Sequence, residues 1–205
     1  DEQMRVVRRD EQRRAAEIGH YAIQIQLAHP SASLKTPSDI NVRTDLEKIF
    51  AGCTPEIVYL HNPADKHDTH VAVFLRCLET LRTLPRNRRP KRVLGCEVWR
   101  GLDWLVDTDK VALDAGVQPA LAAELLKCFE SQIAGGKRYD LATLGRRAAN
   151  ATFHTAHATD KLSAITWAMD LTPLIIDEAL GVANFIQAHI DRLSADIADQ
   201  FKRLS

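Results

Sequence analysis

Residues 56–70 read EIVYLHNPADKHDTH, and this stretch decides the expected fold. The run Glu56–Leu60 is typical of a strand, and the polar run His61–His70 that follows it is typical of a loop. Val71–Leu84 then has the apolar spacing of a helix. In open α/β sheets, ligands bind beyond the carboxyl ends of the strands. The three histidines and two aspartates of the loop therefore lie where a functional site is expected.

His67 and His70 are three residues apart, which places both rings on one side of the first helical turn if the helix begins near Asp68. Neutral imidazole is a preferred zinc ligand, and the positive end of the helix dipole disfavours the charged form. The same spacing also fits two partly exposed loop histidines with Asp68 as the N-cap. Both interpretations remain open at this point.

Strands are expected to alternate with helices along the chain, a pattern that predicts parallel strands joined by crossover helices. The expected class is α/β, with a Rossmann-like, open, mainly parallel sheet flanked by helices and a long C-terminal helix. A length of 205 residues suits a single domain, here 1–205. The expected strands are 21–27, 57–60, 92–99 and 110–114. The expected helices are 5–18, a second helix capped by Ser38 or Asp39 and ended by Gly52, and 71–84, 121–133, 141–151 and 177–204.

Composition narrows the classes of partner. The formal net charge is zero, which gives no reason to expect a nucleic-acid or membrane partner, and no run is apolar enough to span a bilayer. The four cysteines (Cys53, Cys77, Cys96 and Cys128) are scattered and form no Cys-x-x-Cys pair. We therefore expect free thiols, a reducing compartment and, without a signal peptide, a cytoplasmic location.

Three motifs together give the chain a family resemblance. Arg8-Arg9-Asp10-Glu11 looks like an Arg-x-x-Glu helix, His67-Asp68-Thr69-His70 looks like a His-Pro-Asp-His motif, and Ser131-Gln132 looks like a Ser-Gln pair that ends a later helix. On these motifs the chain resembles the PIG-L, or LmbE-like, family of zinc-dependent N-acetylglucosaminyl deacetylases. The resemblance extends over essentially the whole chain downstream of residue 5.

The resemblance implies a hydrolase that uses zinc-activated water to remove an acetyl group from an N-acetylated amino sugar or its conjugate. It implies that His70 binds zinc, that His67 stabilises the tetrahedral intermediate, and that Arg8 contacts sugar hydroxyls. Such chemistry is plausible, since zinc lowers the pKa of bound water to about 7. The family's habit and the apolar stripe of the terminal helix also lead us to expect a homo-oligomer.

Other residues near the strand ends are further candidates. Glu97 and Trp99 close the expected strand 92–99, and a tryptophan face suits a sugar ring, although a core or lid position fits Trp99 equally well. His61 is a ligand, a residue that supports a ligand, or a loop histidine with satisfied hydrogen bonds. We interpret Asp65 as a solvated loop residue and Asp68 as a helix cap, although either could act as a general base.

One departure from the family pattern affects the metal site. The family takes two more zinc ligands and its general base from an Ala-His-Pro-Asp-Asp segment near the N-terminus. Ala28-His29-Pro30 is followed here by Ser31 and no acid, so we interpret it as a strand end. We expect the family's first strand to lie outside this chain. An inactive, family-like scaffold protein and a zinc amidase or esterase with a non-sugar substrate remain alternatives.

Overall fold

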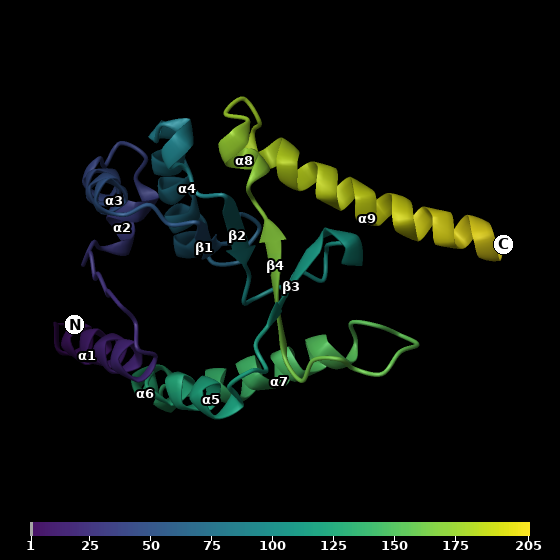
Figure 1. Cartoon of the computed structure of the whole chain (residues 1–205), viewed down its shortest axis with the longest axis horizontal. Coiled ribbons are helices and arrows are strands. Elements are labelled where there is room, and N and C mark those ends of the chain that lie inside the picture. The colour runs from purple at the N-terminus through teal and green to yellow at the C-terminus, as the bar shows by residue number, and fades with distance from the viewer. Residues whose placement is uncertain (1) are drawn as a thin grey trace. The chain divides into compact units, whose positions relative to one another are not determined.

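The computed structural model describes residues 2–205 and divides the chain into two compact units (Figure 1). The first unit combines Asp1–Gln26 with Leu113–Thr166, and the second combines Leu27–Ala112 with Trp167–Ser205. Each unit is therefore assembled from two separate segments of sequence.

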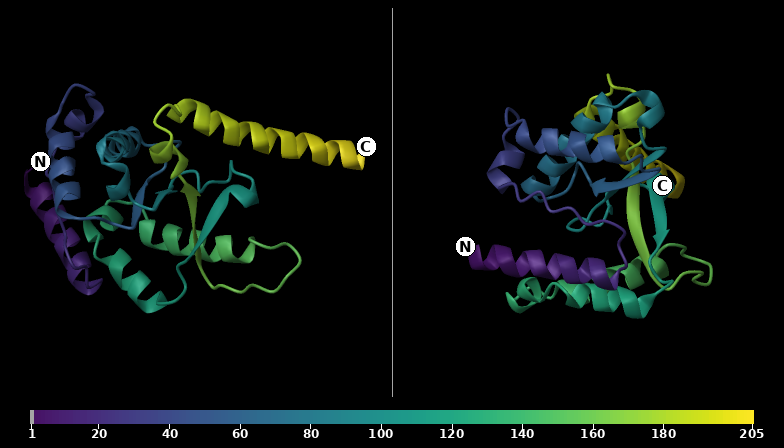
Figure 2. Two further views of the ribbon diagram at one scale, coloured as in Figure 1. Left: turned by 45° about the horizontal axis from the view of Figure 1, so that its top comes forward. Right: turned by 60° about the vertical axis from the view of Figure 1, so that its left-hand side comes forward.

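The first unit is a group of helices. Helix α1 (Glu2–Ile18) runs along α5 (Pro119–Lys127) and α6 (Glu130–Ala134), and both of these contact α7 (Tyr139–Thr152) (Figure 2). The single helix expected over 121–133 is in fact α5 and α6, which are separated at Cys128 and Phe129. The buried carboxylate of Glu11 accepts hydrogen bonds from the backbone and hydroxyl of Ser131, at 2.6 and 2.8 Å, and so fixes the start of α6.

Helix α4 (Asp68–Thr83) is the centre of the second unit. It packs on strand β1 (Ile57–His61) and contacts α2 (Ser31–Lys35), α3 (Asn41–Gly52) and α8 (Pro173–Ile176). Its inner face buries apolar side chains completely or almost completely, because they recur at helical spacing. They are Phe74, Cys77, Leu78 and Leu81.

The sheet is mixed, which corrects the expectation of a mainly parallel sheet. Its order is β1-β2-β4-β3, with β2 at Arg92–Cys96, β3 at Lys110–Asp114 and β4 at Ile165–Asp170. Strands β1 and β2 are parallel, whereas β2 and β4 are antiparallel. The expectation treated each helix between strands as a crossover on the sheet. Helices α5 and α6, however, pack on α7 and on α1. Strand β4 was not expected at all.

Several expected boundaries also change. Residues 21–30 contain no strand, and their apolar side chains Tyr21, Ile23 and Ile25 are exposed, so an alternating pattern alone did not make a strand here. Strand β2 ends at Cys96, before Trp99. Helix α9 (Val182–Leu204) begins five residues after the expected start at residue 177 and ends where expected. Two short 3-10 helices cover Arg86–Arg88 and Asp107–Asp109.

None of the helices in the described part of the chain has the length and apolar character needed to cross a membrane. None of the four cysteines, all within residues 2–205, forms a disulfide; Cys77 and Cys128 are buried, Cys96 is partly buried and Cys53 is exposed.

Candidate metal site

Asn62 shapes the loop that joins β1 to α4. It is fully buried, and its side-chain oxygen accepts the Ala64 N–H at 2.8 Å while its side-chain nitrogen donates to Met169 Sδ at 3.5 Å. Its backbone oxygen accepts the Asp65 N–H at 3.1 Å. A buried, hydrogen-bonded amide of this kind holds one loop conformation, because leaving its groups unpaired is costly. The turn is thus fixed, and Asp65 lies inside it.

Asp65 organises the histidines around it. Its side chain is 0 % exposed, its Oδ2 lies 3.1 Å from His70 Nδ1, and its Oδ1 accepts the backbone N–H of His67 at 2.8 Å. The interpretation of Asp65 as a solvated loop residue is therefore wrong. Sequence could not reveal its burial, because burial depends on the turn that Asn62 holds.

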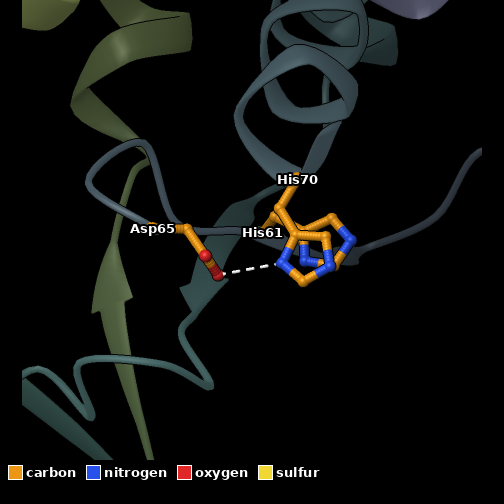
Figure 3. A group of neighbouring side chains, drawn as sticks. All are labelled: His61, Asp65 and His70. Carbon is orange, nitrogen blue, oxygen red and sulfur yellow. Dashed lines mark hydrogen bonds and ion pairs between the residues drawn. The ribbon is translucent and has the colours of Figure 1, made fainter. Parts of the chain in front are cut away.

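His61, Asp65 and His70 form a group whose potential ligand atoms all lie within 4.8 Å of one another (Figure 3). The His61 and His70 rings stack, with centroids 4.0 Å apart and planes 3° apart. Two ligand atoms on a tetrahedral zinc are roughly 3.3 Å apart for bonds of about 2.0 Å, so small side-chain movements suffice to bring this set to a metal. Two imidazoles and a carboxylate are also a donor set that zinc accepts. The residues present therefore fit a zinc ion.

The electrostatic surroundings favour neutral imidazole at this position. Burial lowers the pKa of His61, and the adjacent His70 adds to that effect. His61 is thus neutral near pH 7, which is the form that binds metals.

His67 caps the helix that carries His70. Its Nδ1 accepts the Thr69 N–H at 3.3 Å, which places the proton of the neutral ring on Nε2. In His70, Nδ1 faces Asp65 Oδ2 at 3.1 Å, and both residues belong to the group that could hold a metal. The centroids of the His67 and His70 rings lie 4.7 Å apart. The cap is His67, so the expectation that Asp68 fills this position is wrong.

Glu97 fixes the turn that follows β2. It is 8 % exposed, and its carboxylate accepts the backbone N–H groups of Arg100 and Leu102. Burial raises the pKa of Glu97, and the negative charge of Asp65 raises it further, although the two hydrogen bonds act in the opposite direction. Gly101 and Leu102 follow each other with φ of 69° and 60°. Glu97 thus supports a strained turn beside the site.

The structure brings together only part of the expected site. His67 and His70 are neighbours, as expected, whereas Arg8 is an exposed residue of α1 and belongs to the first unit. Trp99 is 38 % exposed in the turn after β2. Trp104, which the sequence reasoning did not consider, lines a pocket together with Asp65. Its position five residues beyond Trp99, in the same turn-rich segment, was the available signal.

The remaining histidines have other environments. His29 Nε2 lies 3.0 Å from Asp45 Oδ2, outside the group of His61, Asp65 and His70. His154 and His157 are exposed.

No family model and no curated protein matches this chain. The geometry of the His-Asp-His group and of His67 beside it is therefore what supports a function.

Proposed function

We propose that this protein is a metal-dependent hydrolase that removes an acetyl group from an N-acetylated amino sugar or its conjugate. The observation that carries the proposal is the group of His61, Asp65 and His70, with the ring of His67 stacked on that of His70. The acetamido-sugar substrate is supported by the three sequence motifs that resemble the PIG-L family.

His61, Asp65 and His70 would hold the cation. Zinc, when bound, supplies the Lewis acidity that polarises an amide carbonyl and acidifies water. Asp65 would contribute Oδ2, which lies 3.1 Å from His70 Nδ1, the ring nitrogen that faces it. Its second oxygen holds the backbone of His67, so one buried carboxylate positions two adjacent functional rings.

His67 has a separate task in the same reaction. Attack on an amide carbonyl produces an oxyanion, and a positioned donor stabilises that charge. The Nε2–H of His67 is such a donor, because Nδ1 is already occupied by the Thr69 N–H. Its exposure leaves it accessible to a substrate.

Two measurements on matched variants test the proposal. Elemental analysis should find about one zinc per chain in the parent protein and in His157→Ala, an exposed control, and much less in His70→Ala. Acetate release from an N-acetylglucosamine conjugate should be lost with the metal. His67→Ala should retain zinc and lose roughly 10²–10³-fold in kcat, the usual cost of removing one oxyanion donor. Equal zinc in all variants, or zinc-loaded protein that releases no acetate, would contradict the proposal.

A further inference from the structure

A pocket of about 760 Å³ lies beside the candidate metal site within the second unit. Pockets that hold small molecules usually measure roughly 300–1,000 Å³, so this one is large enough for part of a substrate. Asp65 belongs both to the pocket and to the His-Asp-His group, so a ligand in the pocket adjoins that group. The lining consists of Ala64, Asp65, Arg100, Asp103, Trp104, Ile190 and Leu193.

One part of the pocket lining is apolar and comes from two distant segments. Trp104 lies in the segment between β2 and β3, whereas Ile190 and Leu193 lie on α9. Ile190 is 42 % exposed, so part of its side chain is accessible to a ligand. An indole and two branched aliphatic side chains together offer the surface that an apolar ring prefers.

The charged residues of the pocket are of both signs, one arginine and two aspartates. Arg100 and Asp103 are both exposed, and Arg100 Nε donates to the Ala64 carbonyl at 3.1 Å. An anionic ligand would be attracted by Arg100 but repelled by Asp103 and Asp65, and a cationic ligand would meet the reverse. An uncharged ligand has neither penalty.

The pocket is held in shape before any ligand binds. Glu97 fixes the backbone of Arg100 and Leu102, and Leu102 is completely buried in spite of its left-handed conformation. Such a conformation costs a non-glycine residue energy and persists only where the surroundings enforce it. The turn that leads to Trp104 is therefore rigid, which lowers the entropic cost of binding.

We propose that this pocket binds an uncharged apolar ring attached to the acetamido-bearing part of the substrate, and that it selects substrates by this aglycone. The inference rests on the proposed function for the identity of the adjoining group. Ile190 and Leu193 are then specificity residues, and the N-terminal half of α9 forms part of the substrate site.

The test compares the phenyl and methyl β-glycosides of N-acetylglucosamine by titration calorimetry on the full chain. The phenyl glycoside should bind about tenfold more tightly, as expected for burial of one apolar ring. Leu193→Gln should reduce this advantage to below about twofold, and Ile190→Gln should act in the same direction. Ile197→Gln is the matched control, since Ile197 is an exposed isoleucine of the same helix outside the pocket.

The outcomes separate the pocket from the reaction. Equal affinity for the two glycosides, no binding of either, or an advantage that Leu193→Gln and Ile190→Gln leave intact overturns the pocket assignment. Acetate release is measured on the same two compounds. If acetate is released from both glycosides with equal kcat/KM, the proposed hydrolase activity is supported and the proposed role of the pocket is wrong. Selective phenyl binding that depends on Leu193, without acetate release, supports the pocket and overturns the hydrolase.

Discussion

Asp65 Oδ2 lies 3.1 Å from His70 Nδ1, and the carboxylate that makes this contact is fully shielded from solvent. A carboxylate oxygen and an imidazole nitrogen are both zinc donors, so two such atoms that face each other can serve as ligands of one ion. Asp65 and His70 are therefore the two central residues of the candidate metal site.

Asp65→Asn should weaken zinc binding by about 10–100-fold, because the amide keeps the shape of the carboxylate but loses its charge. A competition titration against a chelating dye measures this change. Asp68→Asn is the control, since Asp68 is an exposed acid in the first turn of α4 and lies outside the group. If Asp65→Asn and Asp68→Asn bind zinc equally well, Asp65 has no role at the metal.

Gly95→Ala should destabilise the protein by about 1–3 kcal/mol, as overpacking of a tight core does. A Cβ at Gly95 would come within 2.6 Å of Leu171 Cδ1, and Leu171 is completely buried and so has little room to move. Gly145→Ala should instead stabilise by about 0.4–1 kcal/mol, because that glycine lies within α7 with no atom near its added Cβ. Urea unfolding should show that the two variants change the free energy of unfolding in opposite directions. A neutral Gly95→Ala would mean that β2 and Leu171 are less tightly packed than the distances indicate.

Low pH should weaken the contact between Asp109 and helix α9. Burial would raise the pKa of Asp109, but hydrogen bonds from Arg192 and His189 outweigh it and lower the pKa. Because the folded pKa lies below the unfolded value of about 3.9, the stabilisation is present above pH 4 and is lost as the pH falls through the folded pKa. Asp109→Asn should therefore cost about 1.5–3 kcal/mol at pH 7, the usual worth of hydrogen bonds to a charged group.

Urea unfolding of Asp109→Asn at pH 7 and pH 3 checks this dependence, and the difference from the parent protein should shrink at pH 3. Asp196→Asn, an exposed acid on the same helix, should show little effect at either pH. A cost that is the same at both pH values would show that charge is not the source of the stabilisation.

Cys53 and Cys77 should differ in the reactivity of their thiols. Burial raises the pKa of Cys77 to about 11, so the reactive thiolate is scarce there at pH 8. Cys53 is exposed and should provide the fast phase with a chromogenic disulfide reagent. Cys53→Ser should abolish this phase and Cys77→Ser should preserve it. A fast phase that survives Cys53→Ser would place a reactive thiol elsewhere.

Local signals made the β1–loop–α4 unit predictable. The apolar run before His61, the polar loop and the helical spacing after His70 all lie within 30 residues, and the structure has β1 and α4 where they were expected. Strand β4 was missed because Ile165, Trp167, Ala168 and Met169 are all buried, so no alternation marks it.

The less predictable features depend on contacts between distant residues. The start of α6 is held by a hydrogen bond from Ser131 to Glu11, and Asp65 is buried in a turn that Asn62 shapes while it contacts Met169. Neither contact leaves a periodic trace in the sequence. The same is true of Trp104, which meets Ile190 and Leu193 only in the folded chain.

The hydrogen bonds between Glu11 and Ser131 span 120 residues of sequence, and they have a consequence for synthesis of the chain. A ribosome that adds roughly 5–20 residues per second needs about 6–24 s to pass from the first of these residues to the second. During that interval α1 has already emerged, but the helix that pairs with its buried carboxylate does not yet exist. The first unit can therefore close only after the whole of the second unit's larger segment, Leu27–Ala112, has been synthesised.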